Sequence, residues 1–180
     1  MDRAFAEYRL SAAAKTVYNF VWDDYCSWYI ELIKPDQPGH LRTNTLNVAT
    51  YVLHQILRLL HPFVPFVTEE ILQQLTADRS RTLTFGPWPQ FDVSFRENEL
   101  EARLIQIQNV VTAVRSIRSE LSVPPGKKSD LHVRVDNPAL ADLLKDHFVY
   151  FRSLARIENL ICGTDVKKPP LSASAVISGA

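Results

Sequence analysis

The chain has 180 residues, 46% hydrophobic and 22% charged, which suits one soluble globular domain, or one such domain with a small appendage. Its 20 Lys and Arg residues balance 20 Asp and Glu residues, which excludes a strongly basic protein but not a local basic patch. We find no signal peptide and no apolar run of the roughly 20 residues that a membrane span requires. We therefore expect a cytoplasmic protein without a membrane partner. The widely spaced Cys26 and Cys162 are expected to be buried free thiols.

The first two thirds of the chain predict a helical structure. Four helices have apolar residues at helical spacing, and they are expected at about Arg3–Ile33, Thr43–Leu60, Val67–Leu75 and Glu97–Leu121. The segment before the last of them is predicted to be irregular, apart from a short extended piece at 82–85. Four helices with short connections favour an antiparallel bundle, which we place at residues 1–121.

Residues 122–180 have a different pattern. Residues 130–135 alternate between apolar and polar side chains as in a strand, and 157–162 resemble a second strand. Between them Asn137 and Pro138 favour a helix start, and this helix is expected to run to about Leu154. The region is thus predicted to be a small strand–helix–strand α/β subdomain. A further strand is expected to begin at 175–177, and the chain looks truncated beyond it.

The stretch FVWDDYCSWYIELIKP, from Phe20 to Pro35, is unusually rich in aromatic residues. On a helix, two apolar stripes result: Val17, Val21, Trp28 and Leu32 form one, and Tyr18, Trp22, Tyr25 and Tyr29 form the other. A helix that is apolar on two faces is usually packed on both sides, or has one face that meets a ligand. The pattern therefore permits either core packing of these rings or the stacking of an exposed ring on a nucleobase.

The sequence shows little that resembles an active site. The histidines are scattered and the glycines stand alone, so neither a metal cluster nor a phosphate-binding loop is indicated. Glu69 and Glu70 are adjacent on a helix and point about 100° apart, so they do not converge on one reacting atom. We expect these 180 residues to hold no cofactor or metal and to catalyse no reaction by themselves.

A basic segment offers a candidate binding surface. Arg115 and Arg118 are three residues apart and share one face of the fourth helix, and Lys127 and Lys128 follow in a proline-stiffened loop. Arginine beside exposed aromatic rings is typical of sites that hold unstacked RNA bases. Alternatively, the arginines form ion pairs with acidic residues of the first helix, and the two lysines belong to a solvated loop.

Three segments together resemble the anticodon-binding region of the class I aminoacyl-tRNA synthetases, within that family the valyl-tRNA synthetases. They are the aromatic stretch FVWDDYCSWYIELIKP, the segment LRLLHPFVPFVTEEIL, and the segment VVTAVRSIRSELSVPPGKK. The middle segment is similar to the valine, isoleucine and leucine enzymes alike, whereas the other two favour valine. The resemblance covers essentially the whole chain, and the family's ATP-binding signatures HIGH and KMSKS do not occur in it.

The resemblance implies that the chain holds the anticodon stem-loop of a valine tRNA, whose anticodons share a central adenine and a third-position cytosine. ATP with magnesium, the catalytic core, the editing domain and the coiled coil would belong to the parent enzyme, and DNA is not an expected partner. The candidate tRNA-binding residues are Trp22 and Tyr25 for stacking, and Arg115, Arg118, Lys127 and Lys128 for phosphate or base-edge contacts. An isoleucyl- or leucyl-tRNA synthetase domain and a helical protein-interaction module remain the alternatives.

Overall fold

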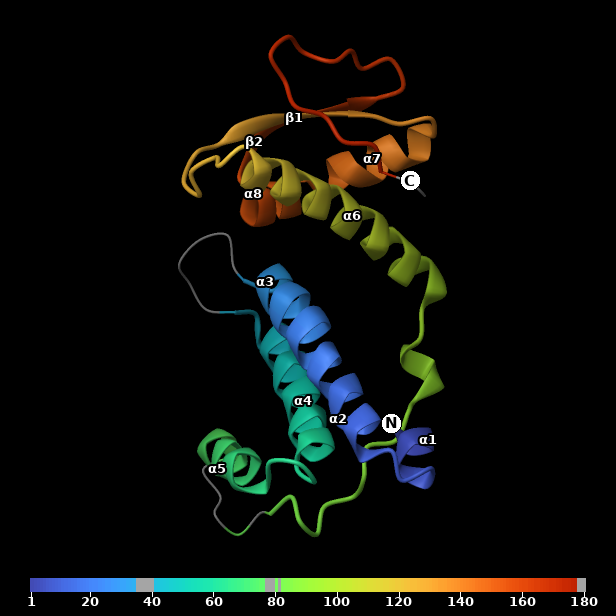
Figure 1. The fold of residues 1–180 in the computed structure, drawn as a ribbon, viewed down its shortest axis with the longest axis vertical. Coiled ribbons are helices and arrows are strands. Elements are labelled where there is room, and N and C mark those ends of the chain that lie inside the picture. Colours follow the sequence, from blue (N-terminus) through green and yellow to red (C-terminus); the bar gives the residue numbers. More distant parts are fainter. Residues whose placement is uncertain (35–40, 77–79, 81, 178–180) are drawn as a thin grey trace. The chain divides into compact units, whose positions relative to one another are not determined.

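The computed structural model describes residues 1–34, 41–76, 80 and 82–177. The chain divides into two compact units, Met1–Val93 and Ser94–Ala180, whose elements are labelled in Figure 1. Each unit has buried apolar side chains of its own. Among them are Val17 and Leu57 in the first unit and Leu144 and Phe151 in the second.

The first helical segment is interrupted once. Helix α1 spans Asp2–Ala6 and α2 spans Leu10–Asn19. Between them Tyr8 has a φ of 55°, which residues other than glycine rarely adopt. The break lets α1 turn aside, so that the Phe5 ring packs on Trp88 at 5.5 Å between centroids. The uninterrupted helix expected from Arg3 is therefore wrong at residues 7–9, because a contact distant in sequence favours the turn.

Beyond α2 the helix continues with wider turns. The segment η1, Phe20–Tyr29, is a π-helix, and the short helix α3, Ile30–Leu32, follows it directly. Within η1 the Ser27 hydroxyl donates a hydrogen bond to the carbonyl of Trp22, five residues earlier, at 2.7 Å. π-Helical turns are rare and are frequent at functional sites. The aromatic stretch therefore lies on an irregular part of a long helix.

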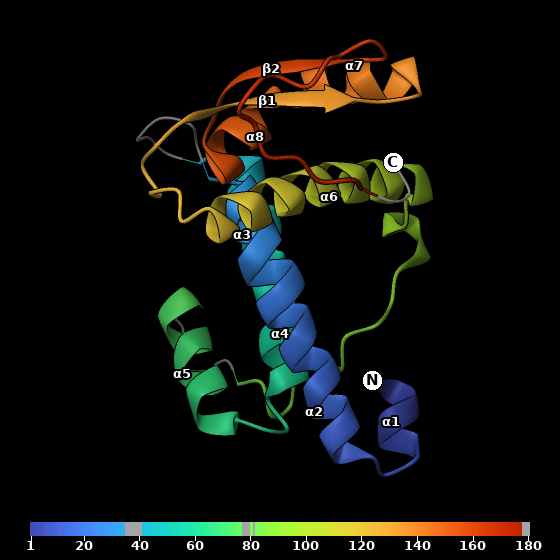
Figure 2. The ribbon, with the colours of Figure 1, turned by 45° about the horizontal axis from the view of Figure 1, so that its top comes forward.

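Helix α4, Thr43–Leu60, has the predicted bounds and lies antiparallel beside α2 (Figures 1 and 2). Helix α5, Pro65–Thr76, packs on α4 and begins two residues before the expected start. The earlier start follows from Pro65, since proline suits the first turn of a helix. His61 connects the two helices, because its Nδ1 atom lies 2.9 Å from the hydroxyl of the buried Thr68.

The segment 82–85 completes the core of the first unit. Leu83 is buried against Leu57 and Leu72, and its backbone N–H donates to the carboxylate of Glu69 at 3.0 Å. The carbonyl of Leu83 accepts a hydrogen bond from the N–H of Gly86 at 3.0 Å, which closes a turn. The extended piece expected here is therefore wrong, since burial of the leucine side chain comes with a turn.

The second unit is a small α/β structure with one long helix. After the short 3₁₀ turn η2, Val93–Phe95, its elements are α6 Asn98–Glu120, β1 Ser129–Arg134, α7 Pro138–Asp146, α8 Phe148–Ala155 and β2 Ile157–Gly163. The two strands are parallel, with Val133 opposite Cys162. Both α7 and α8 pack on β2, and α6 packs on α8. This is the predicted strand–helix–strand order.

Two details of the second unit differ from the prediction. The helix expected to run to Leu154 breaks at His147, whose Nδ1–H donates to the carbonyl of Leu143 at 2.9 Å and so caps the end of α7. Residues 175–177 form no strand, although their composition favours one. In the described part of the chain they have no strand partner, and apolar composition alone does not produce a hydrogen-bonded pair of strands.

The mostly helical fold with a small C-terminal α/β part is confirmed. Helix α6 lies in the second unit, whereas the sequence grouped it with the preceding helices. The functional division into 1–121 and 122–180 stays a prediction. No helix among the described residues is long and apolar enough to cross a membrane.

Candidate nucleic-acid interface

Two aromatic rings of the first unit form an exposed pair. Tyr18, on α2, and Trp22, on η1, are 62% and 61% exposed. They are four residues apart, so they lie on the same face of the helix. Their rings are parallel within 5°, with centroids 6.3 Å apart. The structure thus presents an aromatic platform, which we define as Tyr18 and Trp22, on the solvent side of the helix.

Tyr25, the other predicted stacking residue, is buried. Only 8% of it is exposed, its hydroxyl donates to the carbonyl of Ala49 on α4 at 3.4 Å, and its ring packs on Tyr29 at 5.6 Å. Burial raises the pKa of the Tyr25 hydroxyl, and the neighbouring Tyr29 and Cys26 raise it further. The ring therefore joins the helices of the first unit and offers no open face to a base.

Tyr18 is the stacking candidate that the sequence analysis did not single out. Its place in the same stripe as Trp22 was the available signal. A helical stripe shows which residues share a face but not where along the helix a packing partner ends. Since α4 covers the face at Tyr25, the exposed part of the stripe is its N-terminal half.

The two thiols lie in different environments. Cys162 is buried and Cys26 is exposed, so the expectation of two buried thiols is wrong for Cys26. Burial raises the pKa of the Cys162 thiol, and the charge of Lys145 acts in the opposite direction. Cys26 faces solvent because η1 turns its neighbour Tyr25 toward α4 instead.

Two arginines of α6, Arg115 and Arg118, bind backbone carbonyls within the second unit. Arg115 donates from Nε to the carbonyl of Leu154, near the end of α8, at 2.9 Å. Arg118 donates to the carbonyls of Pro124 at 3.1 Å and Lys127 at 2.6 Å. These contacts are made to backbone carbonyls, and they leave the predicted phosphate contacts and ion pairs of both arginines as predictions. They tie α6 to α8 and to the loop that follows α6.

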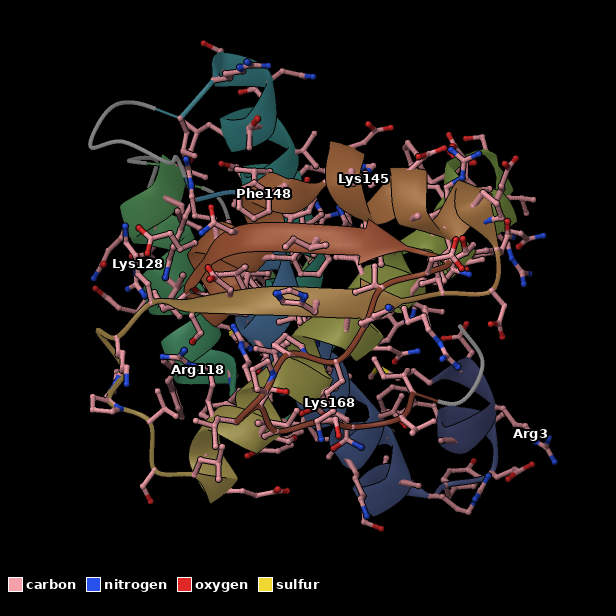
Figure 3. All side chains as sticks on the ribbon, turned by 90° about the horizontal axis from the view of Figure 1, so that it is seen from above. Arg3, Arg118, Lys128, Lys145, Phe148 and Lys168 are labelled. Carbon is pink, nitrogen blue, oxygen red and sulfur yellow. The ribbon has the colours of Figure 1, made fainter. Side chains whose placement is uncertain are left out.

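The two lysines of this loop are exposed. Lys128 forms an ion pair with Glu158 on β2 at 3.1 Å, while the side chain of Lys127 points into solvent. An exposed pair of this kind contributes at most about 1 kcal/mol and exchanges readily with a phosphate. Figure 3 shows Arg118 and Lys128 at the same end of the sheet, where β1 begins. The structure therefore brings Arg118, Lys127 and Lys128 together.

Residues 1–135 match the family described as the anticodon-binding domain of tRNA ligase, and the chain belongs to this family. Its curated relatives include the valine–tRNA ligases of Bacillus licheniformis, Geobacillus kaustophilus and Bacillus cereus, at 35%, 34% and 33% identity. The alignments cover 97%, 97% and 100% of this chain and 20%, 20% and 21% of the relatives. The chain thus spans about a fifth of the length of the curated relatives that it matches.

Proposed function

We propose that the chain binds the anticodon stem-loop of a valine tRNA. Its family supports an anticodon as the ligand, and relatives named valine–tRNA ligase support valine. The observation that carries the proposal is the platform of Tyr18 and Trp22, two parallel rings that are both more than half exposed. Proteins hold unstacked RNA bases on such rings, and every base has a face that can stack there.

The platform and the basic loop have different tasks in this proposal. Trp22 and Tyr18 stack on unpaired anticodon bases, of which the central adenine and the third-position cytosine are common to valine anticodons. Lys127 and Lys128 contact backbone phosphates, which adds affinity without regard to sequence. Arg118 supports the loop through its bonds to the carbonyls of Pro124 and Lys127, and Arg115 ties α6 to α8.

For the whole enzyme we propose the activity that the relatives' name states, the ligation of valine to its tRNA. ATP with magnesium would be used by its catalytic core, which, with the coiled coil, would be this domain's partner in the parent chain in the cytoplasm. The residues of this chain would take no part in that reaction.

The proposal is tested by titrating the 180-residue chain with a labelled valine anticodon stem-loop, at low and at physiological salt. A matched stem-loop carries a changed central base. We expect tighter binding of the unaltered loop and weaker binding of both RNAs as salt rises, because counterions are released on phosphate contact. Equal affinity for both RNAs would show that the chain does not read the anticodon.

A second candidate function is the docking of a protein on helix α5. One observation favours it: Phe66 is 89% exposed, and Val67 and Leu75 are also exposed on that helix. Apolar contacts depend little on salt, so binding that persists at high salt would support this function.

An isoleucyl- or leucyl-tRNA synthetase domain would instead prefer a stem-loop with a different anticodon.

A further inference from the structure

The guanidinium group of Arg118 lies inside the bend of the loop that follows α6, which we define as residues 122–129. It donates to the carbonyls of Pro124 and Lys127 and, through its other terminal nitrogen, to the hydroxyl of Ser129. One side chain thus joins the last turn of α6 to the middle and the far end of the loop. Arginine suits this task, because its planar group presents several fixed donors at once.

The backbone of the loop is closed around the same residue. The N–H of Val123 donates to the carbonyl of Arg118 at 2.8 Å, and the N–H of Lys127 donates to the carbonyl of Pro124 at 3.0 Å. Ser122 has a φ of 51°, which reverses the chain directly after the helix. The adjacent Pro124 and Pro125 restrict the backbone further.

These contacts separate the charge of Arg118 from that of the lysines. The bonds of Arg118 are made to acceptors within the loop, whereas Lys127 is exposed and Lys128 forms an exposed ion pair with Glu158 on β2. A loop that is ordered before binding loses less conformational entropy when its side chains contact a ligand. Arg118 therefore orders the loop that carries the lysines, and it need not touch the ligand itself.

We infer that Arg118 is a positioning residue, which fixes the 122–129 loop so that Lys127 and Lys128 meet the phosphodiester backbone of the bound RNA. This inference rests on the proposed function, and it assigns the phosphate contacts to the lysines alone. It replaces the direct phosphate contact that the sequence suggested for Arg118. The surface that it defines recognises phosphates and not bases.

The variant Arg118→Lys separates charge from geometry, since lysine keeps the positive charge but cannot make the same set of bonds. We expect hydrogen exchange in a peptide that covers 122–129 to become about tenfold faster in this variant. We expect the affinity for the stem-loop to fall severalfold, with an unchanged dependence on salt. Arg103→Lys, on the same helix, is the matched control, because within the described residues Arg103 forms only an exposed ion pair, with Glu99.

The variant Lys127→Gln tests the other half of the inference. Loss of one phosphate contact makes the slope of log affinity against log salt concentration shallower by about 0.7 to 0.9. The affinity would then fall about threefold less between 50 and 200 mM salt. When Lys127 and Lys128 are both replaced by Gln, the further change Arg118→Lys is expected to have no effect on RNA affinity. Independent, additive losses would instead show a direct contact by Arg118.

The outcomes distinguish this inference from the proposed function. If the unaltered chain binds no stem-loop, the proposed function fails and this inference falls with it, whereas hydrogen exchange still reports whether Arg118 orders the loop. If the chain binds RNA and Arg118→Lys leaves either the affinity or the loop exchange unchanged, positioning is wrong while the proposed function stands. Should Arg118→Lys fail to fold, Ser129→Ala removes one of the bonds and is expected to change exchange and affinity in the same directions.

Discussion

At the scale of single residues, burial separates two rings that the sequence treats alike. Trp22 and Tyr25 share one helical stripe, yet 61% of the first is exposed and only 8% of the second. The buried ring contributes to the stability of the first unit, and the exposed ring leaves its face open. The two residues should therefore respond differently when they are replaced.

Replacing Trp22 by alanine is expected to weaken stem-loop binding by about 1 to 3 kcal/mol, the usual contribution of one base–aromatic stack. The free energy of unfolding should change by less than about 0.5 kcal/mol, because most of the ring is in solvent. Fluorescence anisotropy and urea unfolding measure the two quantities. Phe66→Ala, an exposed aromatic of α5, is the control, and an equal loss of RNA affinity there would contradict the assignment.

Ionisation of the Tyr25 hydroxyl is expected to make the free energy of unfolding depend on pH in the alkaline range. Burial raises the pKa of its hydroxyl in the folded state, so the unfolded chain loses this proton first as pH rises. The contribution of the protonated Tyr25 hydroxyl to stability is complete below the ordinary tyrosine pKa of about 10. It is lost as pH rises through the higher pKa of the folded state. Tyr25→Phe should therefore lose less stability than the unaltered chain between pH 9 and 11. Urea unfolding across this range would contradict the account if both proteins showed the same slope.

The role of Arg118 shows what residue spacing can predict. Its distance of three from Arg115 correctly indicated a shared helix face. The spacing could not show that the loop after the helix folds back and offers its carbonyls to the guanidinium group. That contact depends on the reversal of the chain at Ser122, which has a left-handed backbone conformation. The position holds neither glycine nor asparagine, the residues that usually indicate such a conformation in a sequence.

At the scale of elements, local signals predicted the starts and ends of helices well. Asn137 and Pro138 predicted the start of α7, and the structure confirms it. The side-chain oxygen of Asn137 accepts a hydrogen bond from the N–H of Ala139 at 2.9 Å. The breaks at Tyr8 and His147 were missed. Neither has a proline or glycine signal, and the first depends on rings that meet from distant parts of the chain.

Removal of this cap by Asn137→Ala is expected to lower the free energy of unfolding by about 1 kcal/mol. The backbone N–H groups of the first turn of α7 would lose their side-chain acceptor. Urea unfolding provides the measurement. Asn159→Ala is the matched control in the same unit, because among the described residues its side chain bonds only to the exposed Asp130, so the change should cost less than about 0.5 kcal/mol. Equal losses in the two variants would contradict the role of the cap.

At the scale of the whole molecule, the sequence predicted the kinds of element and their order better than their grouping. Helix α6 was expected among the preceding helices, and it lies in the unit that contains the strands. Apolar periodicity shows that a helix has a buried face but not which element covers it. Among the predicted site residues, Trp22, Lys127 and Lys128 are exposed, whereas Tyr25, Arg115 and Arg118 donate hydrogen bonds to backbone carbonyls. The binding roles of all six residues stay predictions.

In the proposed complex, unpaired anticodon bases stack on the exposed aromatic platform. The most direct test places the fluorescent adenine analogue 2-aminopurine at the central anticodon position of the stem-loop and adds the 180-residue chain. Stacking on Trp22 should change the fluorescence of the analogue, and Trp22→Ala should abolish the change while Tyr25→Phe keeps it. A fluorescence change that is the same with the unaltered chain and with Trp22→Ala would contradict the account, as would no change in either.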